Sequence, residues 1–215
     1  MQYFEYGNEE IEYLKKKDKQ LSKVIDQVGM IYREVNNDLF DSLVDTIISQ
    51  QISTKAAQTV KARLKDKVTH ITPEVIISMN EDELRSCGIA GRKAVYLKTL
   101  SQKVLSGELI LESLKEKSNQ EVINELIKLP GIGVWSAEMF LLFSLERKDI
   151  LSFNDFIIQK GLRMIYHHRK ITKELFQKYK KRYGPYGSIA SFYIWHVGNG
   201  NLQGYKDYAP KKSKK

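Results

Sequence analysis

Cysteine is nearly absent from this chain, since Cys87 is the only one among 215 residues. An internal disulfide needs a pair of cysteines, and an iron–sulfur cluster or an all-cysteine zinc site needs several. Histidine is scarce too, with four residues of which His167 and His168 are adjacent. The sequence therefore predicts no Fe–S cluster, no histidine zinc site and no required cofactor.

Long hydrophobic runs are also missing, and no apolar stretch approaches the roughly 20 residues that a membrane-spanning helix needs. The first residues, MQYFEYGNEEIEYLKKK, have none of the features of a signal peptide. We therefore expect a cytoplasmic protein without membrane association. Proline is rare, with four residues in the chain, so few helices are interrupted.

Positive charge, by contrast, is plentiful. Lys and Arg number 35 against 26 Asp and Glu, which gives a net charge of +9 and a pI near 9.4. An excess of this size suggests a polyanionic partner, of which nucleic acid is the commonest. Solubility alone is the alternative reading, because part of the excess lies in the terminal KKSKK at 211–215.

Helix signals are frequent and strand signals are scarce. Thr72 and Pro73 suit the first positions of a helix, and the pairs Asn80 with Glu83 and Ser118 with Glu121 are typical capping boxes. Within residues 41–68, apolar residues from Leu43 to Leu64 recur at spacings that predict amphipathic helix with a break near Gln51. Further helices are expected over 91–106, 135–147, 156–168, 172–184 and 188–198. The pattern predicts an all-α fold with short connections.

The stretch LPGIGVWSAEM, residues 129–139, places two glycines between two predicted helices. Glycine lets the backbone turn tightly, and a new helix presents unpaired N–H groups and the positive end of its dipole at its start. A phosphate can reach such groups directly. An ordinary helix–helix turn is the alternative reading. The candidate DNA-binding residues here are Pro130, Gly131, Ile132, Gly133 and Val134.

Four motifs occur in a characteristic order. The first motif is IISQQISTKAAQTVKARL, and the second is LPGIG, which follows a capped helix. The third is RKDILSFNDFIIQKGL, in which Asp155 lies 20 positions beyond Trp135, and the last is YGPYGSIASFYIWHVGNG. This ordered set, spanning about 39–200, resembles the helix-hairpin-helix (HhH-GPD) DNA glycosylase superfamily. The resemblance implies a two-lobed fold, with a central lobe at 38–135 that ends in the hairpin. The second lobe would combine 1–37 with 136–215, carrying Asp155 and the basic tail, and we expect no extra N-terminal β-domain.

Trp135 stands at an informative position in that family, two residues beyond the second hairpin glycine. Members that also cut the sugar–phosphate backbone carry a lysine there, which forms a Schiff base with the sugar. The resemblance is therefore to base-releasing enzymes without lyase activity, nearest to the bacterial DNA-3-methyladenine glycosylase II type. The iron–sulfur branches of the family are excluded because Cys87 stands alone.

Asp155 matches the family's catalytic aspartate. Cleavage of an N-glycosidic bond develops positive charge on the sugar, and one carboxylate near C1′ can stabilise that charge and orient the attacking water. Asp155 also stands where a helix N-cap is expected, as does Asn154. Capping is thus an alternative role, and an aspartate at a helix start could serve both.

The resemblance implies a base pocket formed by Trp135, Trp195, Met139 and His196. N-alkylated purines carry positive charge, which electron-rich aromatic faces attract. Each of these residues could instead be part of the core. Relatives often carry aromatic residues where this chain has Met139 and His196, so the substrate range stays open.

Two further features rest on the resemblance. Gln51 matches the residue that fills the gap left by a flipped-out base, although Gln50 and Gln51 could be a surface pair. The backbone carbonyls of Ile127, Leu129 and Ile132 match a site for a monovalent cation, sodium or potassium, at the hairpin.

Together these features predict a monomeric, monofunctional glycosylase of base excision repair, which releases alkylated purines such as 3-methyladenine and 7-methylguanine from damaged double-stranded DNA. A monofunctional glycosylase for another damaged base is one alternative. The other is a helix-hairpin-helix DNA-binding module without catalysis.

Overall fold

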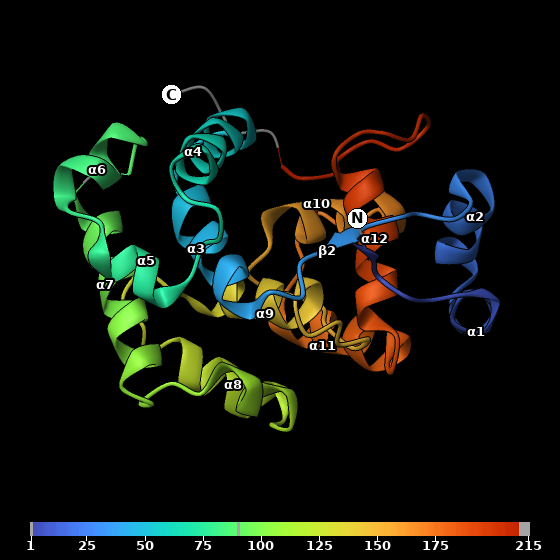
Figure 1. Cartoon of the computed structure of the whole chain (residues 1–215). Coiled ribbons are helices and arrows are strands. Elements are labelled where there is room, and N and C mark those ends of the chain that lie inside the picture. The colour runs from blue at the N-terminus through green and yellow to red at the C-terminus, as the bar shows by residue number, and fades with distance from the viewer. Residues whose placement is uncertain (1, 90, 211–215) are drawn as a thin grey trace. The chain divides into compact units, whose positions relative to one another are not determined.

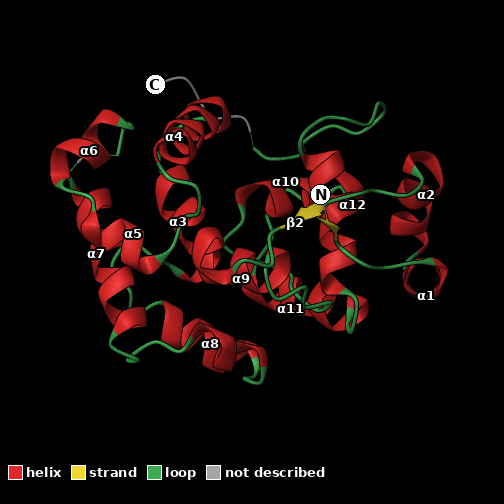
Figure 2. Cartoon of the chain, viewed as in Figure 1, coloured by secondary structure: helices red, strands yellow, loops and turns green. Residues whose placement is uncertain are grey.

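A computed structural model describes residues 2–89 and 91–210 of the chain. The chain divides into two compact units, Asn36–Leu145 and the pair of segments Met1–Val35 and Glu146–Lys215. Helices dominate both units, as Figure 2 shows by colour. The prediction of an all-α fold is confirmed.

The unit made of both chain ends contains five helices in its described part, labelled in Figure 1. They are α1 (Asn8–Lys17), α2 (Lys19–Val28), α10 (Phe156–Tyr166), α11 (Lys173–Tyr183) and α12 (Gly187–Gly198). A short antiparallel ribbon joins β1 (Gln2–Tyr3) to β2 (Glu34–Val35), with Gln2 opposite Val35. These strands are too short for their alternation to be visible in the sequence, which is why helix and strand signals did not predict them.

Helices α10 and α12 form the core of this unit because two glycines allow their backbones to approach. A Cβ atom on Gly161 would lie 2.2 Å from the carbonyl oxygen of Ile194, and one on Gly198 would lie 2.5 Å from that of Ile157. Only a glycine fits at such distances. Helix α12 is buried along almost its whole length, so its apolar residues pack on every side.

A buried acidic residue connects α2 with α11. Asp18 is the N-cap of α2, where its carboxylate accepts the N–H groups of Gln20 and Leu21. Its other oxygen accepts a bond from the Arg182 guanidinium at 2.5 Å. A buried carboxylate needs such partners, so this pair holds the N-terminal helices against the C-terminal ones.

The central unit, Asn36–Leu145, contains the remaining helices. They are α3 (Leu39–Ser49), α4 (Thr54–Lys67), α5 (Pro73–Ser78), α6 (Glu81–Ser86), α7 (Arg92–Leu105), the 3-10 helix η1 (Leu111–Lys115), α8 (Asn119–Leu126) and α9 (Val134–Phe143). The Thr72 cap and both capping boxes are present, and the break near Gln51 separates α3 from α4. These sequence predictions are confirmed.

The observed division differs from the expected one at its second boundary, which follows Leu145 rather than Trp135. The reason is that α9 packs against α3 and α8 within the central unit. The terminal lysines at 211–215 lie outside the described residues. Among the described helices, none is both long enough and apolar enough to cross a membrane.

The α10–α12 contact gives a stability prediction. Gly161→Ala should lower the free energy of unfolding by about 3 kcal/mol or more, because the new methyl group overlaps a backbone carbonyl that cannot move aside cheaply. The matched control is Gly133→Ala, where an added Cβ meets nothing within 4 Å and only the helix start is affected, by about 1 kcal/mol at most. Equal losses in urea unfolding would contradict the role of Gly161.

Candidate functional site

Asp155 is held by two hydrogen bonds at the start of α10. One carboxylate oxygen, Oδ1, accepts the backbone N–H of Ile158 at 2.9 Å, which makes Asp155 the N-cap. The other, Oδ2, accepts a bond from the indole Nε1 of Trp195 at 3.1 Å. The residue is only 6% exposed. Asp155 therefore caps its helix and keeps a fixed orientation. The capping role is confirmed, and the catalytic role remains a prediction.

Trp195 lies on α12 and is 8% exposed. Its ring stacks against that of Phe192, with centroids 6.2 Å apart. Because the indole N–H points at Asp155, this tryptophan orients a carboxylate as well as filling space. The sequence offered Trp195 only as a pocket wall or a core residue, and this third role depends on a contact between residues 40 positions apart.

The other expected pocket residues lie in both units. Trp135 is at the beginning of α9 and is 46% exposed, with the half-buried Met139 one turn further along the same helix. His196 follows Trp195 on α12 and is half-buried. Their assignment to a base pocket remains a prediction.

The two glycines of the hairpin between α8 and α9 serve different structural purposes. Gly131 has a φ of +88°, and a Cβ there would lie 2.5 Å from the Tyr96 ring of α7. Gly133 faces open space and is the N-cap of α9, with no side-chain cap. Ile132, between them, is buried and anchors the turn. The helix start at Val134 is thus approachable from outside, as an anion site requires.

The four-residue loop between α3 and α4, residues 50–53, is tied to this hairpin. Gln51 is exposed and has a φ of +57°, which is unusual for a residue with a side chain. Its neighbour Gln50 donates from Nε2 to the Gly131 carbonyl oxygen. Lys93 of α7 donates from Nζ to the carbonyl oxygens of Ile48 and Gln50, at 2.7 and 2.8 Å.

A cavity of about 530 Å³ opens beside this loop. It is lined by Gln50, Gln51, Gly88, Arg92, Lys93, Tyr96 and Gly131. No sequence signal selects Lys93 or Tyr96, because their partners lie at least 35 residues away along the chain. The role of Lys93 becomes clear only in the folded structure, where its hydrogen-bond partners Ile48 and Gln50 lie next to it.

The carbonyls expected to bind a monovalent cation lie in the same turn. Ile127 is the C-cap of α8, and the Leu129 carbonyl accepts the N–H of Ile132 at 3.1 Å. Over residues 2–89 and 91–210 there is no cluster of three or more His, Cys, Asp or Glu side chains suited to a metal ion. Any cation here would depend on backbone oxygens, and this site remains a prediction.

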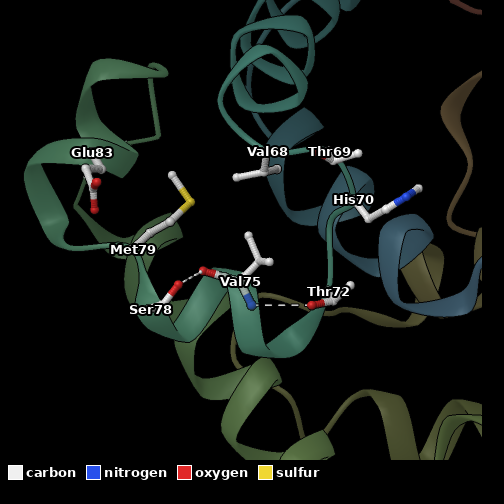
Figure 3. A pocket seen from close by; sticks show the side chains of 8 residues that line it. All are labelled: Val68, Thr69, His70, Thr72, Val75, Ser78, Met79 and Glu83. Carbon is white, nitrogen blue, oxygen red and sulfur yellow. Dashed lines mark hydrogen bonds between the residues drawn. The ribbon is translucent and has the colours of Figure 1, made fainter.

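A second cavity of the central unit, about 560 Å³, contains none of the predicted site residues. Figure 3 shows Val68, Val75 and Met79 pointing toward its interior. Its ionisable residues are His70 and Glu83. The dashed bonds in the figure are local helix contacts, Thr72 with Val75 and Ser78 with Val75. Three of its eight lining residues are apolar and five are polar, and none of them is a residue predicted to act in catalysis.

The family model described as "HhH-GPD superfamily base excision DNA repair protein" matches residues 44–185. DNA-3-methyladenine glycosylase 1 of Schizosaccharomyces pombe is 34% identical over 179 residues, which cover 80% of this chain and 78% of that protein.

Two solved structures share the fold over nearly the full chain. A DNA-3-methyladenine glycosidase from Bacillus halodurans has a TM-score of 0.85 and 30% identity, covering 97% of both chains. The Schizosaccharomyces pombe 3-methyladenine DNA glycosylase in complex with abasic DNA has a TM-score of 0.80 and 29% identity, covering 93% of this chain and 100% of that one. With the hairpin, the capped Asp155 and these matches together, the chain belongs to the HhH-GPD superfamily of base excision DNA repair proteins.

Proposed function

We propose that this chain is a monofunctional DNA glycosylase that hydrolyses the N-glycosidic bond of alkylated purines in double-stranded DNA. The observation that carries the proposal is the Asp155 carboxylate, buried and oriented by Ile158 and Trp195. Relatives named 3-methyladenine glycosylases support the substrate class, and the relative bound to abasic DNA supports base release. The protein would act as a cytoplasmic monomer without a required cofactor.

In this mechanism the bond between C1′ and the purine nitrogen breaks, and its electron pair leaves with the base. The sugar becomes an oxocarbenium ion, which a nearby carboxylate stabilises electrostatically. A water molecule then forms the new C1′–O bond and gives its proton to the carboxylate of Asp155. An N-alkylated purine is already positively charged and leaves easily, so no strong general acid is needed.

DNA binding would depend on the hairpin. The amides at the start of α9 follow Gly133, where an added Cβ atom would meet nothing within 4 Å. Contacts of these amides with phosphate would carry no sequence information, which suits an enzyme that must search all sequences. Gln51 would fill the gap left by the flipped base, and Trp135 would stack on a cationic base.

The proposal is tested with duplexes that contain methylated purines, uracil or 8-oxoguanine, by measuring released base and strand nicking with and without alkali. Release of methylated purines only, with nicking only after alkali, is the expected outcome. Release of another base would favour the first alternative. No release from any duplex would leave a DNA-binding module, and nicking without alkali would contradict the argument from Trp135.

Asp155→Asn should slow base release by roughly 10²–10⁴-fold, because the amide can neither stabilise the sugar cation nor take the proton. Asparagine is also a good N-cap, so stability and DNA binding should be retained. Single-turnover release and binding to abasic DNA measure the two separately. Near-normal turnover by this variant would exclude Asp155 from the mechanism.

Trp195→Phe removes the indole N–H and keeps an aromatic ring. A hydrogen bond to a charged group contributes about 1.5–3 kcal/mol, so base release should fall roughly 10- to 100-fold. The matched control is Tyr193→Phe on the same helix, whose lost bond goes to the Gly29 carbonyl instead. That control should lower stability and leave the rate unchanged. Equal rate losses for both variants would argue against an orienting role.

A further inference from the structure

The end of α3 carries carbonyl groups that have no partner within the helix. Such groups need donors from elsewhere. Lys93 supplies them, since its ammonium bonds to the carbonyls of Ile48 and Gln50. Partial burial lowers the pKa of Lys93. This lysine therefore uses its donors inside the protein, although it lines a cavity next to the hairpin.

The second of those bonds fixes the peptide group that precedes Gln51. The Gln50 carbonyl belongs to the peptide plane from which the φ angle of Gln51 is measured. With that plane held, Gln51 keeps its left-handed φ of +57°. A residue with a Cβ pays a penalty there, and such conformations persist only when surrounding contacts over-determine them.

The side chain of Gln50 provides a second connection. Its Nε2 donates to the carbonyl of Gly131, at the centre of the hairpin turn. Gly131 in turn lies against Tyr96, one turn beyond Lys93 on α7. Loop 50–53, α7 and the hairpin thus form one braced cluster inside the central unit.

We propose that Lys93 and Gln50 are positioning residues that hold Gln51 in its left-handed conformation and fix its loop to the hairpin. The inference rests on the proposed function, in which Gln51 enters the duplex and the hairpin binds phosphate. Lys93 acts through the backbone of Gln51 and is not itself a phosphate ligand. Its effect should appear only where a base must be extruded from a duplex.

The test compares Lys93→Met with a control on the same helix. Lys98 also donates to two helix-end carbonyls, those of Ile77 and Met79, but these belong to the end of α5. Lys98→Met therefore removes the same kind of contact away from loop 50–53. Lys93→Arg keeps the donors and the charge and should rescue most of the activity.

Single-turnover base release is measured on a 7-methylguanine duplex and on the same oligonucleotide as a single strand. Lys93→Met should lower the duplex rate roughly 10-fold, the factor that about 1.4 kcal/mol of conformational penalty produces, with the single-strand rate unchanged. Lys98→Met should leave the ratio of the two rates as in the wild type. Gln50→Glu replaces the donor that bonds to the Gly131 carbonyl with an acceptor. It should therefore also lower the duplex rate and leave the single-strand rate unchanged.

Three outcomes would overturn the proposal. The first is an unchanged duplex rate for Lys93→Met, and the second is an equal loss on both substrates. The third is a change in the salt dependence of DNA binding by Lys93→Met. If the slope of log K against log salt concentration becomes shallower by about one, the variant has lost a phosphate contact.

A separate measurement distinguishes failure of this inference from failure of the proposed function. The fluorescence of 2-aminopurine beside an abasic site reports unstacking on binding and needs no base release. If the wild type releases no base, the proposed function fails. A weaker fluorescence increase for Lys93→Met at saturation still supports the positioning role, and an equal increase overturns it.

Discussion

The close contact between α10 and α12 determines the geometry of the candidate site. Gly161 and Gly198 let the two backbones approach to distances that no side chain permits. This approach allows the indole of Trp195 to reach the carboxylate that begins α10. A catalytic group must be held closely in place to be effective. The packing of these two helices therefore fixes the position of the Asp155 carboxylate, to which the proposed function assigns catalysis.

In the central unit, hydrogen bonds from the Lys93 ammonium group help to order loop 50–53. In the proposed function loop 50–53 enters DNA, and it is a short, exposed loop with few contacts of its own to order it. Lys93 and Gln50 supply such contacts. Lys93 bonds to the backbone carbonyls of Ile48 and Gln50, which precede Gln51, and the Gln50 side chain bonds to the carbonyl of Gly131 in the hairpin. In the proposed function Gln51 takes the place of a nucleobase. An exposed residue at the tip of a loop whose preceding backbone is held in place suits that role.

The positive charge of the chain is used in more than one way. Lys93, Lys98 and Arg182 bond to carbonyls or to a buried carboxylate within the protein. The net charge of +9 thus does not equal the number of groups available to DNA. In the proposed function the hairpin contributes backbone amides, which add affinity for phosphate without adding formal charge. Salt dependence reports on the remaining cationic contacts.

The sequence by itself determined the helical class, the capped helix ends and the family, because caps, glycine turns and ordered motifs are local signals. Asp155 as a helix N-cap and the glycine turn of the hairpin were predicted for the same reason, and both are present. The ribbon β1–β2, the bond between Trp195 and Asp155 and the bracing by Lys93 were decided only by the tertiary structure. Each joins residues more than 30 positions apart, and no local pattern encodes which distant donor reaches which acceptor. Their hydrogen bonds exist only once the packing has fixed both partners.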